Sequence, residues 1–217
     1  MRDFPLFRQP RDTTMCGGYC LVASLYAFEL VPIRKPIKLN KIDKETLSFT
    51  GPPVVLEEGD DLYLLMKKLY SLIGIISLEK HSCYISSIPG LSSPVAAAYI
   101  CRELGLDVKI LFRDEARMEA LRLQFPQEFR LNEKIQVPMG YALAENRIGA
   151  NEVIMTPVKN RDNNYHSIVL GPEGQIYDPL HFDRKERLVG RERAWNSSLE
   201  VKSDIDWLGV ALKVTLP

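Results

Sequence analysis

Three residues of this sequence have the types and the order that nucleophilic chemistry needs. Cys16 lies near the start of the chain, and His166 and Asp178 lie near its end. A cysteine thiolate is a strong nucleophile, an imidazole moves protons near neutral pH, and a carboxylate orients an imidazole and supports its charge. Because 150 residues separate Cys16 from His166, the elements that carry these residues have to be predicted first.

Cys16 opens a segment whose apolar residues recur at helical spacing, which predicts a helix over residues 16–30 with one buried face. We expect the polar residues 12–14 to cap this helix, so that the thiol lies among free N–H groups that lower its pKa. Gly17 and Gly18 weaken a helix, and close approach of a substrate backbone to the sulfur would explain them. The alternative is a small buried cysteine at a loosely formed helix start.

A hairpin is predicted around residues 171–174, which read Gly-Pro-Glu-Gly. This pattern fits a type I turn followed by a left-handed glycine, and it joins two strands through a three-residue loop. Gly171 then pairs with Gln175, and Ile168 lies opposite Asp178.

In this register His166 and Asp178 lie on the same face of the hairpin as diagonal neighbours, roughly 7–8 Å apart. A carboxylate at that position would fix the tautomer of the imidazole and favour its charged form. Each residue also has a simpler interpretation, since His166 can be a structural histidine and Asp178 a turn residue before Pro179.

The remaining elements divide the chain into a first part rich in helices and a second part rich in strands. This order predicts an α+β fold in one domain, with a helical lobe over about 1–125 and a β lobe over about 126–217. Asp60-Asp61 and Ser93-Pro94 mark two helix starts. The expected helices are 16–30, 62–69, 94–104 and 114–124, and the expected strands are 107–112, 151–158, 165–171, 175–177 and 207–216.

The segments 34–59 and 77–92 read as long polar loops without a core role. Loops of this length within one domain tend to carry function. We therefore expect both segments to border the cleft between Cys16 and His166 and to select the substrate.

Composition limits the class of protein. The chain has 217 residues, 46% of them hydrophobic, and its 28 basic residues equal its 28 acidic ones. Nothing in this balance indicates a nucleic acid or a membrane as partner. The N-terminal residues lack a signal peptide, so we expect a cytoplasmic protein or one secreted without a cleavable signal. The four cysteines have neither zinc-ligand spacing nor a disulfide pattern, and we expect neither a metal nor a cofactor.

The order of these motifs resembles the papain-like cysteine peptidase superfamily, and within it the bacteriocin-processing (C39-like) peptidases. The matching positions are Gln9, Asp12, Cys16-Gly17, His166 and Asp178-Pro179. The resemblance implies a papain-like fold, in which the helix carrying the nucleophile packs on a C-terminal antiparallel β-sheet.

The resemblance also implies acyl transfer, with Cys16 as nucleophile, His166 as acid and base, and Asp178 orienting the ring. The backbone N–H of Cys16 would hold the oxyanion. Gln9 would be a second donor, or else an ordinary surface glutamine. The implied substrate is a peptide bond in a protein or peptide. One alternative is a glutamine deamidase acting as a secreted bacterial effector, and another is an inert papain-like binding module.

Overall fold

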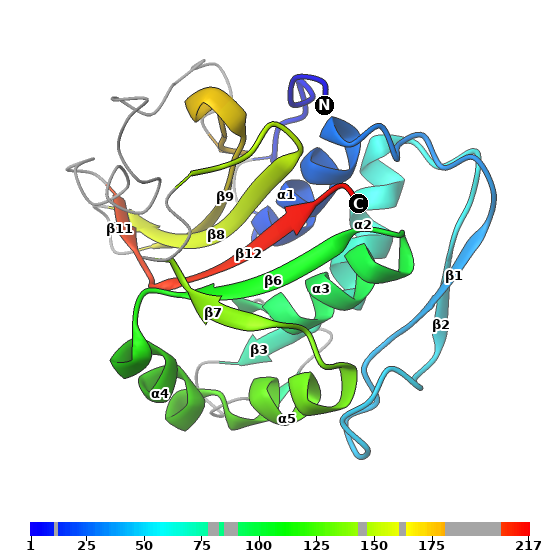
Figure 1. The fold of residues 1–217 in the computed structure, drawn as a ribbon. Coiled ribbons are helices and arrows are strands. Elements are labelled where there is room, and N and C mark those ends of the chain that lie inside the picture. Colours follow the sequence, from blue (N-terminus) through cyan, green and yellow to red (C-terminus); the bar gives the residue numbers. More distant parts are fainter. Residues whose placement is uncertain (11–12, 78–82, 85–90, 143–146, 161–163, 181–204) are drawn as a thin grey trace.

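The computed structural model describes residues 1–217 except 11–12, 78–82, 85–90, 143–146, 161–163 and 181–204. Its architecture is α+β and papain-like, as expected (Figure 1). A large sheet runs through the centre of the molecule, and helices pack against it. None of the described helices has the length and apolar character needed to cross a membrane.

The large sheet has the strand order β10-β9-β8-β12-β6-β7, and β11 pairs with β8. All its pairings are antiparallel except that of β6 with β7. Because β6 comes from the part of the chain expected to be rich in helices, about 1–125, and lies inside the sheet, this part and the strand-rich part share one core. The strands are β6 (Asp107–Phe112), β7 (Met139–Tyr141), β8 (Glu152–Asn160), β9 (Tyr165–Leu170), β10 (Ile176–Tyr177), β11 (Ile205–Trp207) and β12 (Val210–Thr215).

The expected helices are present, and one further helix accompanies them. Asp61, Ser93 and Asp114 each cap a helix by accepting a hydrogen bond from the backbone N–H three residues later, as expected for the first two. Helix α5 was not predicted, because it begins at a proline shortly after α4, and a proline at that point indicates the end of a helix. The helices are α1 (Cys16–Ala27), α2 (Leu62–Leu72), α3 (Pro94–Glu103), α4 (Glu115–Gln124) and α5 (Pro126–Ile135).

Helix α1 is buried on nearly every side, which differs from the single buried face expected. It packs between α2 and the strands β8 and β9, so most of its surface meets protein. The expected side-chain cap is also absent: Met15 is the N-cap and makes no side-chain hydrogen bond, and the hydroxyl of Thr13 donates to the carbonyl oxygen of Pro10 instead. Asp12 lies outside the described residues.

The segment 34–59 forms a hairpin whose base belongs to the hydrophobic core. The expectation of a polar loop without a role in the core was therefore wrong. Leu39 and Leu56 are fully buried, and Phe49 stacks on Tyr99 of α3 at 3.8 Å between ring centroids. Figure 1 shows this hairpin along the right-hand side of the molecule. A second small sheet has the order β4-β3-β5. The strands are β1 (Ile37–Asn40), β2 (Pro53–Leu56), β3 (Ile75–Ser77), β4 (Cys83–Tyr84) and β5 (Leu91–Ser92).

Candidate active site

The β9–β10 hairpin has the register that its turn residues predicted. Ile176 pairs with Leu170 and Tyr177 with Val169, and the N–H of Gly171 donates to the carbonyl oxygen of Gln175 at 2.9 Å. Gly174 adopts a φ of 77°, the left-handed conformation that a glycine allows at this point of the turn. The turn therefore sets a register in which Asp178 lies opposite Ile168, as a diagonal neighbour of His166.

His166 and Asp178 are hydrogen-bonded to each other. The Nε2 atom of His166 lies 2.7 Å from Oδ1 of Asp178. The side chain of His166 is 8% exposed and that of Asp178 is 19% exposed, so solvent screens the pair only weakly. Asp178 Oδ1 also accepts a hydrogen bond from the N–H of Leu180 at 2.9 Å, which helps to hold the carboxylate in place.

Cys16 meets this pair from the first turn of α1. Its thiol lies close enough to His166 and Ser167 for both to lower its pKa, although 149 residues of chain lie between the cysteine and the histidine. Since Nε2 of His166 faces Asp178, the other ring nitrogen, Nδ1, is left for Cys16. The structure thus brings Cys16, His166 and Asp178 together in the order thiol, imidazole and carboxylate.

The electrostatics of the group favour a thiolate–imidazolium pair. Burial acts to raise the pKa of the Cys16 thiol, but the hydrogen bond and the charge of His166 outweigh it, so that this pKa is lowered. For His166, burial acts to lower the pKa, and the hydrogen bonds to Asp178 and Cys16 raise it to about 9. At neutral pH these shifts keep the proton on the imidazole.

Cys20 and Cys101 differ from Cys16 in this respect. Both are fully buried, and burial raises the pKa of Cys20 well above its ordinary value and that of Cys101 to about 12. The thiol of Cys20 donates to the carbonyl oxygen of Ser167 at 3.2 Å. A neutral, buried thiol is a poor nucleophile, and of these three cysteines only Cys16 has a lowered pKa.

Gln9 is 2% exposed, which rules out the surface glutamine that the sequence left open. Its Nε2 donates to the carbonyl oxygen of Thr13, while its Oε1 is buried without a partner among the described residues. The backbone N–H of Gln9 donates to the carbonyl oxygen of Pro179 at 2.9 Å. The segment before α1 is therefore attached directly to the residue that follows Asp178.

The space beside Gly17 and Gly18 is filled by the protein, not left open for a substrate. A Cβ added to Gly17 would lie 2.4 Å from Oγ of Ser92, and one added to Gly18 would lie 3.0 Å from Cβ of Tyr70 on α2. On the side where a Cβ would lie these glycines therefore leave no room for a substrate backbone, although Gly17 also lines the pocket described below. They allow β5 and α2 to pack closely against the start of α1.

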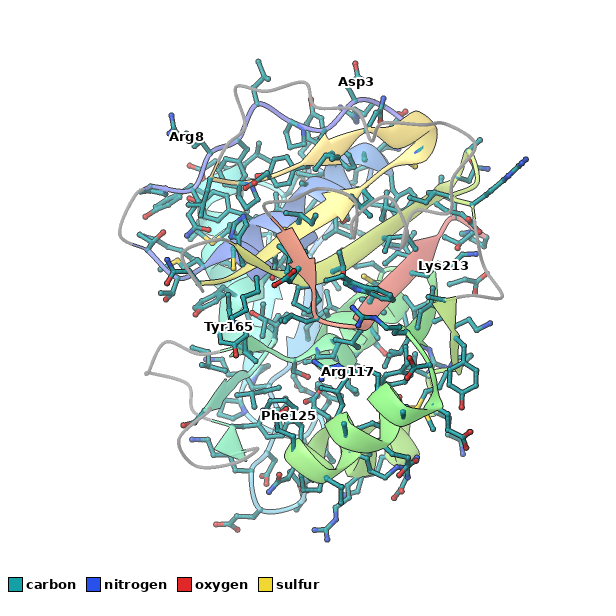
Figure 2. All side chains as sticks on the ribbon, turned by 90° about the vertical axis from the view of Figure 1, so that its left-hand side faces the viewer. Asp3, Arg8, Arg117, Phe125, Tyr165 and Lys213 are labelled. Atoms are coloured by element: carbon teal, nitrogen blue, oxygen red, sulfur yellow. The ribbon has the colours of Figure 1, made fainter. Side chains whose placement is uncertain are left out.

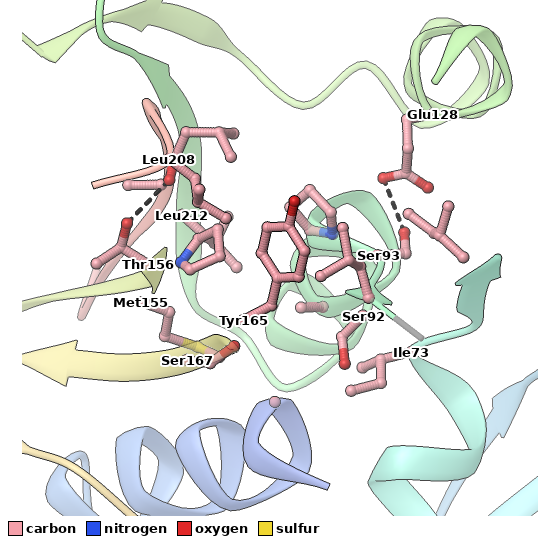
Figure 3. Close-up of a pocket in the computed structure, with 18 of the residues that line it drawn as sticks. Ile73, Ser92, Ser93, Glu128, Met155, Thr156, Tyr165, Ser167, Leu208 and Leu212 are labelled. Carbon is pink, nitrogen blue, oxygen red and sulfur yellow. Dashed lines mark hydrogen bonds between the residues drawn. The ribbon is translucent and has the colours of Figure 1, made fainter. Parts of the chain in front are cut away.

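Cys16, Gln9 and His166 border an open pocket of about 600 Å³. Figure 3 shows its interior, with Tyr165 between the side formed by Thr156 and Leu212 and the side formed by Ser92 and Ile73. Most of the wall is apolar, from α3, α4, α5 and the strands β6, β8 and β12. The segment 34–59 contributes no residue to it, so the expectation for that segment was wrong.

Of the segment 77–92, Leu91 and Ser92 line the pocket, while 78–82 and 85–90 lie outside the described residues. Several polar residues of the wall were not predicted as site residues, among them Ser92, Arg117 and Glu128. Glu128 carried a weak signal, because it is a carboxylate next to the buried Phe129. Among the described residues, no group of three or more His, Cys, Asp or Glu side chains is arranged to hold a metal ion.

The chain matches the model of a known protein family. A family model described as invasion plasmid antigen J, cysteine protease, matches residues 8–206, a range that contains Gln9, Cys16, His166 and Asp178. The chain belongs to this family. It is thus a cysteine-dependent hydrolase of the protease type, which acts on protein substrates. No curated protein matches the sequence.

Proposed function

We propose that this member of the family hydrolyses a peptide bond through a Cys16–His166–Asp178 triad. One observation carries the proposal: His166 is hydrogen-bonded to Asp178 at 2.7 Å and lies beside Cys16, whose pKa it lowers, at the edge of an open pocket. The lowered pKa of Cys16 and the raised pKa of His166 supply the two charge states that acyl transfer needs.

The reaction follows from these charge states. The Cys16 thiolate attacks the carbonyl carbon, and a C–S bond forms. The C–N bond then breaks as the His166 imidazolium gives its proton to the leaving amine. Neutral His166 next takes a proton from water, which attacks the acyl carbon and releases the thiolate. Asp178 holds the ring throughout and stabilises its positive charge.

The oxyanion has two candidate donors. Because no side chain caps α1, the backbone N–H of Cys16 at the helix start is available to a substrate oxygen. Gln9 is the second: one hydrogen of its Nε2 donates to the carbonyl oxygen of Thr13, and the other is left for the oxyanion. Its attachment to Pro179 keeps this amide in register with the triad.

The pocket favours a peptidase over a glutamine deamidase. A deamidase needs a slot for one glutamine side chain, whereas a pocket of about 600 Å³ has room for several side chains. Its largely apolar wall fits apolar parts of a substrate. The early Gln9…Cys16-Gly17 and late Asp178-Pro179 order, which resembles that of C39-like peptidases, supports the same choice.

The test is mass spectrometry of casein and of a cell extract incubated with the wild-type protein. New peptide termini that are absent with Cys16→Ala and present with Cys101→Ala support the proposal, since Cys101 is a buried thiol outside the site. A mass gain of about 1 Da at glutamine without cleavage would assign a deamidase. No change in any substrate, combined with slow alkylation of Cys16, would assign a binding module.

A further inference from the structure

Two charged side chains other than His166 occur among the described residues of the pocket wall, Glu128 and Arg117. They differ in how far other groups of the protein satisfy their hydrogen bonds. Glu128 is 7% exposed and accepts hydrogen bonds from the hydroxyl of Tyr84, from the hydroxyl of Ser93 at 2.9 Å and from the N–H of Val95 at 3.3 Å. Figure 3 shows the contact with Ser93. The protein's own donors therefore satisfy this carboxylate.

Arg117, the second charged residue, is only partly satisfied. Its Nε donates to the carbonyl oxygen of Leu208 at 2.7 Å, and its backbone N–H is capped by Asp114. No ion pair and no further side-chain hydrogen bond of Arg117 exist within the described part of the chain. The two terminal Nη groups, which carry four N–H donors, thus have no hydrogen-bond partner among the described residues, and the side chain lines the pocket.

The surroundings of Arg117 make this lack of partners unusual. Leu121, Phe125 and Leu208 form the neighbouring wall, so the charge lies beside apolar surface. Burial lowers the pKa of the guanidinium and the nearby Arg113 lowers it further, while Asp114 and Tyr165 act in the opposite direction. An arginine remains protonated under such shifts, and a charge beside apolar surface binds an opposite charge more strongly than it would in water.

Arg117 also lies near the candidate active site. Tyr165 directly precedes His166 in β9, and it is close enough to Arg117 to influence its pKa. Figure 2 shows Tyr165, Arg117 and Phe125 on one side of the molecule. A substrate whose scissile bond lies at Cys16 would therefore pass this guanidinium within the same pocket.

We propose that Arg117 is a specificity-determining residue that binds a carboxylate of the substrate within the pocket. The planar fork of a guanidinium matches a carboxylate with two parallel N–H···O bonds. The carboxylate belongs either to an aspartate or glutamate side chain or to a chain terminus. The inference rests on the proposed function, because it assigns one substrate contact of that site.

Arg117 has a structural role as well, and an experiment has to separate the two. The bond from Nε to Leu208 holds the turn between β11 and β12, and a Cβ on Gly209 would lie 2.7 Å from Cγ of Arg117. Loss of the side chain can therefore loosen this turn. Arg117→Lys keeps the charge without the fork, and Arg117→Gln removes the charge.

The experiment uses chloroacetyl-capped peptides of one to four residues, whose methylene carbon is attacked by the Cys16 thiolate as chloride leaves. Each peptide is made in three forms: with a C-terminal aspartyl amide, with a C-terminal asparaginyl amide, and with asparagine carrying a free terminal carboxylate. Rates of Cys16 modification are measured by intact-protein mass spectrometry. Iodoacetamide, which carries no charge, reports the reactivity of Cys16 by itself, and thermal unfolding reports the fold.

We expect one peptide length at which a carboxylate form reacts about tenfold faster than the neutral form. This ratio of rates corresponds to a free-energy difference of about 1.4 kcal/mol. The form that gains identifies the source of the carboxylate. Arg117→Gln should bring the ratio to about one, and Arg117→Lys should keep part of it. Arg122→Gln is the matched control, because Arg122 lies on the same helix and pairs with Glu119 outside the pocket.

Two results overturn the inference: equal rates for all three forms with wild-type protein, or an unchanged ratio in Arg117→Gln. The first result needs no variant and so does not depend on how Arg117→Gln folds. The ratio is defined at any absolute rate of Cys16 modification. Slow modification by iodoacetamide would therefore count against the proposed function, whereas a ratio of one counts against the role of Arg117 alone.

Discussion

Gly17 lies directly against Ser92 at the start of the helix that carries Cys16. A Cβ on Gly17 would be 2.4 Å from Oγ and 2.9 Å from Cβ of Ser92, and 3.3 Å from Cδ1 of Ile73. The second of these contacts involves an atom fixed to the backbone, so rotation of the hydroxyl cannot relieve it. The position of β5 along the pocket thus depends on the absence of a side chain at Gly17.

The first prediction concerns this contact. Gly17→Ala gains about 1 kcal/mol of helix propensity but overpacks the contact, which costs about 1–3 kcal/mol, so we expect a net loss of stability and a displaced β5. The midpoint temperature of thermal unfolding and the alkylation rate of Cys16 should both fall. The double variant with Ser92→Gly should recover most of the loss, and a double variant no better than Gly17→Ala would contradict the stated cause.

The second prediction separates two cysteines one helical turn apart. Cys16→Ala should abolish turnover with little change in stability, because Cys16 is only partly buried. Cys20→Ala should keep most of the activity and lose about 1 kcal/mol of stability, since it removes a small, fully buried side chain. Turnover and denaturant unfolding measure these effects. Loss of turnover in Cys20→Ala alone would reverse the assignment.

The third prediction concerns pH. Because the pKa of Cys16 is lowered, alkylation by iodoacetamide should continue well below pH 7. The alkylation rate should not change as the pH rises through 9, because Cys16 is already a thiolate there. Peptide cleavage also needs the imidazolium as acid, so it should fall as pH rises through about 9, where His166 loses its proton.

The same measurement has an internal control. In His166→Ala the thiol of Cys16 loses its charged partner while its burial remains, so its pKa should rise. Alkylation at pH 6 should then drop by about 100-fold or more, as for an ordinary thiol. Identical pH profiles in the wild type and in His166→Ala would exclude the ion pair.

The fourth prediction tests the role of Asp178. Asp178→Asn keeps an oxygen that can accept from Nε2 of His166, so part of the activity should remain, whereas Asp178→Ala should lose more. Both variants should lower the pKa of His166, because the carboxylate raises it. The upper limb of the cleavage profile should therefore move to lower pH. A limb that stays at about pH 9 in Asp178→Ala would show that the carboxylate does not act on the ring.

The fifth prediction concerns the wall of the pocket. Glu128→Gln should reduce the free energy of unfolding by about 1–3 kcal/mol, because the amide offers one acceptor oxygen where Tyr84, Ser93 and Val95 need two. The comparison is Glu133→Gln on the same helix, an exposed position where little change is expected. Equal unfolding curves for both variants would show that the buried network contributes little.

Local features were predictable from the sequence because their causes lie within a few residues. The turn at residues 171–174 sets the register of its hairpin through backbone geometry, and this register alone places His166 beside Asp178. The helix starting at Ser93 and the strand Asp107–Phe112 were predicted for the same reason, since a cap and an apolar run are local signals.

The sequence by itself indicated most of the helices and strands of the large sheet and the three residues that meet, but the tertiary structure decided their surroundings. The burial of Gln9, the contact of Gly17 with Ser92 and the core position of Leu39 all depend on partners far away in the chain. The same holds for Arg117 and Glu128, which become pocket residues only because α4 and α5 pack beside the sheet. The periodicity of apolar residues shows that one face of an element is buried. Which element packs against that face is known only from the folded structure.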